Sequence, residues 1–411
     1  MKTLVFLTDS YPLTAGEFFI DDEMKVLSHH FQKIIVLIKE QPKANNLNRY
    51  IPENLEITTY KENITLKTKI GGLWNIFRLF FIKEWIWTLQ KYELKQWIPV
   101  FKIMYMDVLR AQTLQKQIKK LPILNNKNTI YYSYWHDYKA LALAFLKSKN
   151  SQINSIARAH GGDVFANRQT PPYLPFKNFI LKNLNQTFSI SDIGEKYFCD
   201  YTSRNYGDKI TVSRLGKFNN RKPILFKTDN QITICSCSHF NPMKRVHLIV
   251  DILSELKIKN IKWVHFGWGF PKDENLVYEK IKNLIPDLNF EFKGQVSNEV
   301  VFDFYANNYV DLFINVSDSE GIPVSIMEAL SAGIPIIATA VGGTPEAVPP
   351  EVGFLIEKDF NTFEVAKIVR SYLQSSESER VKYRENAHNF WQENYDAQRN
   401  YTNFTKIILN I

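Results

Sequence analysis

The sequence predicts an α/β fold of two domains, each built around a parallel β-sheet. Short apolar runs typical of buried strands recur along the chain, and most are followed by a loop and a segment with helical periodicity. The chain has 411 residues, enough for two domains of ordinary size. Its composition, with 45% hydrophobic and 23% charged residues, is typical of a globular protein.

The first half alternates strands and helices as a parallel sheet requires. Residues 41–70 are polar and contain Pro42 and Pro52, so no regular element is expected there. The expected strands are residues 4–7, 34–38, 129–133, 153–159, 187–189 and 210–215, and the expected helices are residues 21–27, 140–146 and 193–198.

The second half repeats the alternation after residues 219–223 (NNRKP), which have the composition of a linker. The tail, residues 380–411, has a long helical pattern. The expected strands are residues 231–235, 261–266, 288–292, 311–316, 334–338 and 352–356, and the expected helices are residues 246–256, 300–306 and 324–330.

The most informative stretch is residues 320–345 (EGIPVSIMEALSAGIPIIATAVGGTP). A strand ends just before it, and Pro323 suits the first turn of a helix. The backbone N–H groups of Gly321, Ile322 and Val324 are therefore expected at a helix N-terminus, which attracts phosphate groups.

Two glutamates flank this helix start. Glu320 lies at its mouth, and Glu328 follows about two helical turns later. A carboxylate beside a phosphate site can accept hydrogen bonds from a pair of sugar hydroxyl groups. The alternative is that both glutamates are solvated and bind no ligand. The intervening Gly-Ile-Pro, and the glycines that end the following elements at Gly333 and residues 342–343, favour a ligand site.

Loops of the first half supply further candidates. His160 stands between an expected strand and two glycines, so its imidazole can project into a cleft between the domains. Arg158 and Asp163 lie close to it in the sequence and are further candidates. Gly16 lies in the first strand-to-helix loop, where open α/β sheets meet ligands, although a simple turn would also explain it.

Cations follow the first strand of the second half. Lys244 can neutralise a diphosphate as a flexible point charge. Arg245 is its neighbour, and His239 stands five residues before Lys244.

Taken together, these motifs resemble the retaining glycosyltransferases of the GT-B fold, family 4. The resemblance is carried by the Glu320/Glu328 pair, the AGIPII and GGTPE segments and the HGGD run that starts at His160. It implies two Rossmann-like domains that face a central cleft. Residues 1–217 would bind the acceptor and residues 218–389 the nucleotide-sugar donor, with a final helix of about residues 390–411 crossing back to the first domain.

The resemblance also implies roles. Lys244 and the amides from Gly321 to Val324 would meet the donor diphosphate, which Gly16 also faces; Glu328 would hold the ribose. Glu320 and His160 would lie at the donor sugar and its anomeric centre. Arg158 and Asp163 would orient His160 or hold the acceptor. One departure is His239, because relatives generally carry arginine there and a neutral histidine neutralises a diphosphate less well.

We therefore expect a retaining hexosyl- or N-acetylhexosaminyl-transferase. It would use a UDP- or GDP-sugar and a glycan or lipid-linked saccharide acceptor, in bacterial surface polysaccharide biosynthesis. No cofactor or metal is expected, because neither a G-x-G-x-x-G nor a D-x-D element is evident beside the site. The alternative is a catalytically degenerate protein that serves as a binding subunit of a glycan-assembly complex, which His239 favours.

An aromatic block at residues 71–121 carries four of the eight tryptophans. They are interleaved with cations, as in helices that lie on a membrane surface. The alternative is packing of the tryptophans in the domain's own core. The tryptophans are Trp74, Trp85, Trp87 and Trp97, and the cations are Lys83, Lys91, Lys95, Lys102 and Arg110.

The net charge of +9 suits an acidic partner, such as a phosphorylated ligand or an anionic membrane. No nucleic-acid-binding motif is evident, so nucleic acid is not expected. Three cysteines imply no disulfide framework. No signal sequence or membrane span is expected. The predicted location is the cytoplasm, with peripheral attachment to the inner face of the cytoplasmic membrane.

Overall fold

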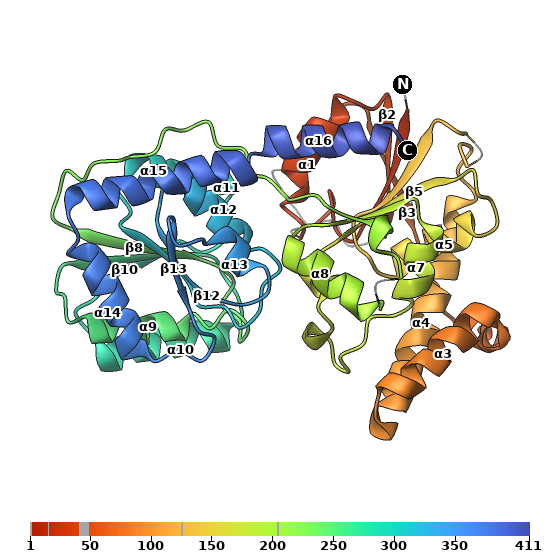
Figure 1. The fold of residues 1–411 in the computed structure, drawn as a ribbon, viewed down its shortest axis with the longest axis horizontal. Helices are drawn as coiled ribbons and strands as arrows, with labels where there is room; N and C mark the ends of the chain where they lie inside the picture. Colours follow the sequence, from red (N-terminus) through yellow and green to blue (C-terminus); the bar gives the residue numbers. More distant parts are fainter. Residues whose placement is uncertain (1, 15, 41–48, 125, 204) are drawn as a thin grey trace. The chain divides into compact units, whose positions relative to one another are not determined.

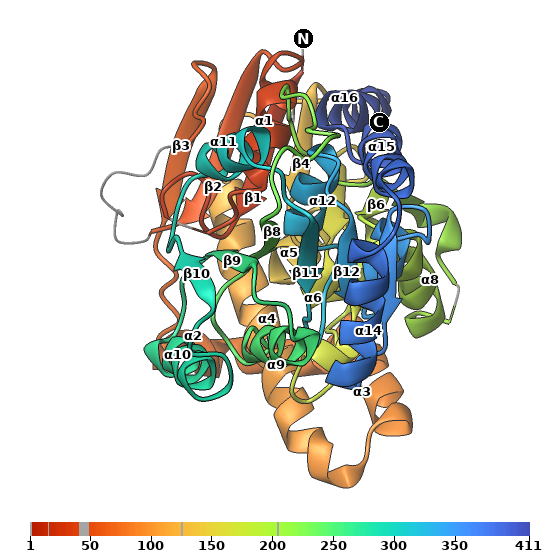
Figure 2. The same cartoon turned by 90° about the vertical axis from the view of Figure 1, so that its left-hand side faces the viewer.

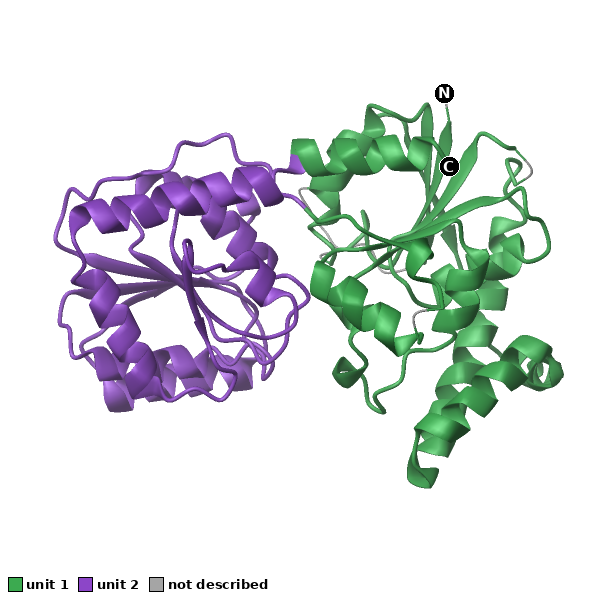
Figure 3. Ribbon diagram, in the orientation of Figure 1, with its two compact units in different colours: residues 1–215, 398–411 green, residues 216–397 purple. Residues whose placement is uncertain are grey.

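The computed structural model describes residues 2–14, 16–40, 49–124, 126–203 and 205–411. The chain divides into two compact units, which Figure 3 shows in different colours. The first unit comprises Met1–Leu215 and Gln398–Ile411, and the second comprises Gly216–Ala397. Each unit is built on a parallel sheet, which confirms the predicted fold class.

Seven parallel strands form the first unit's sheet among the described residues, in the order β3-β2-β1-β4-β5-β6-β7. Because the strand order reverses between β1 and β4, the loops that leave these two strands flank the crevice where such sheets bind ligands. The strands are β1 (Thr3–Thr8), β2 (Lys33–Lys39), β3 (Leu55–Tyr60), β4 (Thr129–Ser133), β5 (Asn154–Ala159), β6 (Gln186–Ser189) and β7 (Ile210–Val212).

Strand β3 corrects the expectation that residues 41–70 are irregular. It pairs in parallel with β2 at the edge of the sheet, with Leu55 opposite Ile34. Most of its residues are at least partly exposed, so its sequence, LEITTY, lacks the continuous apolar run of a buried strand. Residues 41–48, which include Pro42, lie outside the described residues.

Helices cover both faces of the first sheet (Figures 1 and 2). Side chains of β1 alternate between these faces: Leu4 and Phe6 pack with α1 and α16, whereas Val5 and Leu7 pack with α4 and α5. The helical segments are α1 (Ile20–Ser28), α2 (Leu66–Gly72), η1 (Leu73–Phe77), α3 (Leu79–Lys91), α4 (Leu94–Ile118), α5 (Tyr138–Lys147), α6 (Gly161–Val164), η2 (Ala166–Arg168), α7 (Lys177–Asn183), α8 (Asp192–Tyr201), η3 (Gly207–Lys209) and α16 (Ala397–Leu409).

The tail forms two helices rather than one. Helix α15 (Glu377–Asn394) belongs to the second unit, and α16 belongs to the first apart from its first residue. Phe404 of α16 packs its ring 5.4 Å from that of Tyr132 and 4.9 Å from that of Phe188, measured between ring centroids. The final helix is thus part of the first unit's core, as the resemblance implied.

The second unit's sheet has six parallel strands among the described residues, in the order β10-β9-β8-β11-β12-β13. The order reverses between β8 and β11, where Ile234 lies opposite Leu312. The loops after these two strands are therefore the expected ligand loops of this unit. The strands are β8 (Ile232–Cys237), β9 (Ile261–Phe266), β10 (Asn289–Phe292), β11 (Leu312–Asn315), β12 (Ile336–Thr339) and β13 (Gly353–Ile356).

Two sets of helices sandwich this sheet. One face carries α9 (His247–Leu256), α10 (Pro271–Leu284) and α14 (Thr362–Leu373), and the other carries α11 (Asn298–Asn307), α12 (Val324–Ser331) and α15 (Figures 1 and 2). The short helix α13 (Thr344–Ala347) follows β12.

The aromatic block folds as α2, η1, α3 and α4, and α3 with part of α4 projects from the rest of the first unit (Figure 1). Packing in the core holds for part of the block, because Trp85 and Trp87 lie against the core. Trp74 and Phe77, by contrast, are 78% and 70% exposed, and contact with a membrane stays a prediction for them. No described helix is long and apolar enough to cross a membrane.

Candidate functional site

The loops after β8 and β11 bring two predicted residues together. Lys244 follows β8, Glu320 follows β11, and the Lys244 Nζ lies 2.5 Å from Glu320 Oε1. A Lys–Glu pair at the reversal of strand order is a consequence of the topology, because parallel strands deliver both loops to the same edge.

Glu320 is buried and well hydrogen-bonded. Its Oε1 also accepts hydrogen bonds from Ser317 Oγ at 2.6 Å and from Asn315 Nδ2 at 3.4 Å. Burial makes an unpaired charge costly, so the ion pair with Lys244 offsets part of the cost of burying the Glu320 carboxylate. Lys244 is the more exposed partner, with 22% of its side chain accessible, and can approach an anionic ligand.

The helix start that the sequence predicts is present. Helix α12 begins at Val324, and Pro323 occupies the capping position. The carbonyl of Pro323 accepts hydrogen bonds from the amides of Ile326 and Met327. Gly321 and Ile322 precede this turn, beside Glu320.

The Gly-Gly loop after β12 supports the same turn. Gly343 donates its N–H to the carbonyl of Gly321 at 2.7 Å. Gly342 has φ +54°, and a Cβ there would lie 1.8 Å from the carbonyl oxygen of Glu320. Only glycine can therefore pack its backbone this closely against the candidate site.

Replacing Gly342 with alanine is expected to lower the free energy of unfolding by about 2 kcal/mol, because the added methyl group would displace the Glu320 loop and the backbone would be strained. Chemical denaturation measures this effect. The matched control is Gly71→Ala in α2, where an added Cβ meets no atom within 4 Å. We expect the control to stabilise the chain by roughly 0.5–1 kcal/mol. Equal responses would contradict the prediction.

Glu328 faces a cation that the sequence did not reveal. Its carboxylate lies 3.5 Å from Lys217 Nζ and accepts a hydrogen bond from Asn298 Nδ2 at 2.9 Å, and both Glu328 and Lys217 are buried. Lys217 stands in the segment that the sequence indicates only as a domain boundary, and Asn298 begins α11. Neither position carries a motif, so contact in three dimensions alone identifies them.

His239 and Arg245 differ in what they contact. His239 is exposed, and its ring lies 5.5 Å from that of Trp268. Although His239 is exposed, its ring is partly shielded from water; this desolvation, and secondarily the charge of Lys244, lower the His239 pKa, which favours a neutral imidazole at pH 7. Arg245 donates from Nε to the carbonyl of Val316 at 2.8 Å and from Nη2 to that of Lys358 at 2.9 Å. These two bonds fix the loop after β11. They also direct the Arg245 guanidinium towards backbone carbonyls.

In the first unit, His160 follows β5 inside an aromatic cage. Its ring centroid lies 4.7 Å from that of Tyr134, 4.6 Å from that of Trp135 and 6.0 Å from that of Phe19. The Nε2 atom is buried and makes no hydrogen bond to any described residue. Burial, reinforced by the charge of Arg158, lowers the pKa of His160 well below its usual value, so the ring is neutral.

Asp163 positions His160. Its carboxylate accepts hydrogen bonds from the backbone N–H groups of His160 and His136, which fixes the turn after β5 to the turn after β4. Burial raises the pKa of Asp163 to about 6.

Arg158 lies in the interior of the first unit. Its guanidinium pairs with Glu23 at 3.2 Å and donates to Tyr132 Oη at 2.7 Å and to the carbonyl of Ser213 at 2.8 Å. The side chain has no exposed surface with which to contact an acceptor. Its influence on His160 is electrostatic.

The loop around Gly16 is organised by Glu17, which the sequence analysis did not identify. The Glu17 carboxylate accepts hydrogen bonds from the N–H groups of Ser10 at 2.7 Å and Tyr11 at 2.9 Å, and from Trp135 Nε1. A Cβ at Gly16 would lie 2.6 Å from Ser10 Oγ, so this loop is tightly packed. An acidic residue in a polar loop offers no sequence signal for such a role.

Among the residues that the structure describes, no group of three or more His, Cys, Asp or Glu side chains is placed to hold a metal ion. Metal independence stays a prediction.

The chain is similar to glycosyltransferases both in sequence and in fold. Residues 217–390 match the family described as glycosyl transferases group 1. A segment is 35% identical over 131 residues to the O-antigen biosynthesis glycosyltransferase WbnH of Escherichia coli; the alignment covers 29% of this chain and 35% of that protein. The chain thus spans about a third of the length of this relative.

Solved structures share the fold of the whole chain. Sucrose-phosphate synthase from Thermosynechococcus elongatus matches with a TM-score of 0.71 and 14% identity, over 99% of this chain and 98% of that one. Anabaena HepE, solved in complex with UDP and glucose, matches with a TM-score of 0.66 and 14% identity, over 100% of both chains. The fold is therefore GT-B.

Proposed function

Residues 217–390 belong to the glycosyl transferases group 1 family, and from this premise we propose that the protein transfers a sugar from a nucleotide sugar to a glycan or lipid-linked saccharide with retention of anomeric configuration. The observation that carries the proposal is the Lys244–Glu320 pair at the reversal of strand order, next to the start of α12.

In the proposed mechanism the leaving group is a nucleoside diphosphate. Lys244 and the positive end of α12 stabilise the charge that develops on it, and Glu328 accepts hydrogen bonds from the ribose hydroxyls. Glu320 orients Lys244 and contacts the donor sugar. In this proposal His160 is neutral, and its Nε2, which has no hydrogen-bond partner among the described residues, accepts or donates one hydrogen bond at the sugar.

The comparisons support particular substrates. HepE was solved with UDP and glucose, which favours a UDP-sugar donor, either a hexose or an N-acetylhexosamine. WbnH is an O-antigen biosynthesis glycosyltransferase, which favours a surface polysaccharide precursor as the acceptor. No metal takes part in the proposal, because Lys244 and the α12 amides supply the positive charge.

A screen of UDP- and GDP-sugars by thermal shift, followed by a transfer assay with the best donor, tests this function. A donor that binds should raise the melting temperature by mass action. The second candidate is a catalytically degenerate binding subunit, which the exposed, neutral His239 favours. Donor binding without turnover on any glycan acceptor would favour that candidate.

We also propose that the protein binds the inner face of the cytoplasmic membrane through a docking surface formed by α2, η1, α3 and the start of α4. Its exposed apolar side chains are accompanied by several exposed cations and one exposed acid, Glu93. Apolar and aromatic groups mixed with cations suit an anionic bilayer surface. The exposed apolar residues are Leu66, Ile70, Leu73, Trp74, Phe77, Leu79, Ile82, Ile86, Leu94 and Ile98.

The double substitution Trp74→Ala and Phe77→Ala is expected to reduce binding to anionic vesicles at least tenfold, because both rings lose their contact with the bilayer. Vesicle flotation measures the bound fraction. The matched control is Phe226→Ala with Phe363→Ala, which removes two exposed rings from the second unit. Wild-type protein that stays unbound at low salt would refute the docking surface.

A further inference from the structure

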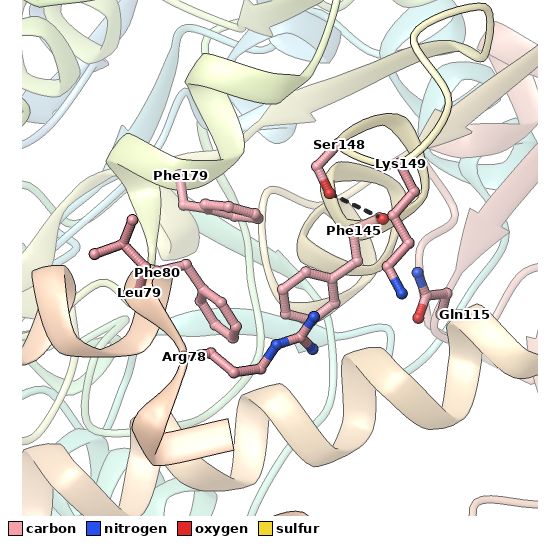
Figure 4. A pocket seen from close by; sticks show the side chains of 8 residues that line it. All are labelled: Arg78, Leu79, Phe80, Gln115, Phe145, Ser148, Lys149 and Phe179. Carbon is pink, nitrogen blue, oxygen red and sulfur yellow. Dashed lines mark hydrogen bonds between the residues drawn. The ribbon is translucent and has the colours of Figure 1, made fainter. Parts of the chain in front are cut away.

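Two cavities in the first unit lie beside the docking surface. One, of about 240 Å³, opens between the start of α3 and the end of α5 (Figure 4). The other, of about 420 Å³, continues between α3 and α7. They share Leu79, Phe80 and Phe179 as lining residues, and we call them together the α3–α7 cavities.

Five aromatic side chains line the α3–α7 cavities, together with the polar side chains of Gln115, Ser148, Asn178 and Asn183. The ring centroid of Phe80 lies 5.0 Å from that of Phe145 and 5.2 Å from that of Phe179. Figure 4 shows these three rings gathered together, with the Arg78 guanidinium beside them. Trp87 lines the second cavity. Such walls suit a hydrocarbon chain, and each buried methylene group strengthens binding about fourfold.

The rim of the cavities is cationic. Arg78 and Lys149 border the first cavity, Lys83 and Lys182 border the second, and all four are exposed. None of these four cations has an ion-pair partner among the described residues. Cations that border a cavity with several aromatic walls, and that have no ion-pair partner among the described residues, favour an anionic ligand with an apolar portion.

The acidic residue that lines the second cavity does not offset this charge fully. Glu84 is buried, and its Oε1 accepts hydrogen bonds from Tyr173 Oη at 2.7 Å and from the N–H of Phe176 at 2.9 Å. Burial raises its pKa to about 7, so a substantial fraction is neutral near pH 7.

We propose that the α3–α7 cavities bind one anionic phospholipid molecule drawn from the bilayer. Its phosphate lies among Arg78, Lys83, Lys149 and Lys182, and its hydrocarbon chain lies along Phe80 and Phe179. This inference rests on the proposed membrane docking, since the docking surface brings the cavities to the lipid, and it is independent of sugar transfer. A bound lipid differs from surface adsorption in having a stoichiometry of one and a preference for its headgroup.

Short-chain lipids test the site without a bilayer. Dihexanoyl-phosphatidylglycerol, kept below its micelle-forming concentration, should bind the full-length protein one-to-one in calorimetry. Dihexanoyl-phosphatidylcholine, with the same chains and no net charge, should bind at least tenfold more weakly. Inorganic phosphate at the same concentration should give no heat, because it lacks the hydrocarbon chain. Saturable binding of phosphate alone would show an ion site and overturn the lipid site.

Charge reversal at the rim supplies the second test. Lys83→Glu with Lys182→Glu should weaken dihexanoyl-phosphatidylglycerol binding at least tenfold. The matched control, Lys272→Glu with Lys282→Glu, makes the same charge change at two exposed positions of α10 in the second unit, outside the cavities and the docking surface, and should leave that affinity unchanged.

Equal loss in both double variants, or equal affinity for the two lipids, would overturn the proposed cavity site. Vesicle flotation and transfer assays on a detergent-solubilised acceptor separate this result from failure of the docking surface or of the enzymatic function.

Discussion

Replacing Lys244 with methionine is expected to lower kcat/KM for sugar transfer about 10²- to 10³-fold. The diphosphate leaving group gains charge in the transition state, and a cation that meets it contributes more there than in the ground state. Methionine keeps most of the length of lysine while removing the charge. Steady-state kinetics with the donor found in the nucleotide-sugar screen measure the loss.

A second effect must be separated from this one. Lys244 Nζ also neutralises the buried Glu320 carboxylate, so Lys244→Met alone leaves a buried charge without its cation. That loss is destabilising by roughly 3 kcal/mol or more. The control combines Lys244→Met with Glu320→Gln, which removes both charges while the amide oxygen of the new side chain can still accept the hydrogen bond from Ser317.

The double variant decides between the two roles of Lys244. If Lys244 binds the diphosphate, the double variant recovers stability but is far less active than Glu320→Gln alone. If the role of Lys244 is only to neutralise Glu320, the double variant is as active as Glu320→Gln alone, which would contradict the proposed mechanism. Glu320→Gln alone gives the reference for the contribution of the carboxylate.

The site in the second unit was accessible to sequence analysis because each part has a local signal. Glycine and proline at fixed places beside Glu320 predict a loop and a helix start, and α12 begins at the predicted residue, Val324. Lys244 could be found because it follows a strand with a clear apolar run. Parallel topology then determines that loops far apart in the chain share one edge.

The missed features depend on contacts that no local pattern encodes. Lys217 pairs with Glu328, and Glu17 accepts hydrogen bonds from amides of its own loop, only once the chain has folded. Edge strand β3 lacks a buried run, so it gives no strand signal. Arg158 shows the converse: it stands in a functional-looking segment, but its contacts with Glu23 place it in the core.

Replacing His160 with phenylalanine is expected to lower the transfer rate about 100-fold with little change in stability. The imidazole Nε2 is buried with no hydrogen-bond partner among the described residues, and an unsatisfied buried polar atom costs about 1–3 kcal/mol. Phenylalanine keeps the ring inside the cage formed by Tyr134, Trp135 and Phe19 while removing that atom. It also removes the hydrogen bond between the imidazole and the Tyr134 backbone. Because these two effects on stability oppose each other, we expect a free energy of unfolding close to that of the wild type together with reduced activity.

The pH dependence of stability gives this prediction a second measurement. Burial lowers the folded-state pKa of His160 below 6.5. At pH values below 6.5 the unfolded chain therefore binds a proton on His160 that the folded chain does not bind. The contribution of His160 to the free energy of unfolding is complete above pH 6.5 and falls by about 1.4 kcal/mol per pH unit below that pH. His160→Phe should remove this loss, so the stability of the variant relative to the wild type should rise as the pH falls from 6.5 to 5. His136, which is also buried with a lowered pKa, is present in both proteins and cancels. A variant that is less stable than the wild type at pH 5 would show that His160 serves the fold, and the proposed contact with the sugar would lose its structural support.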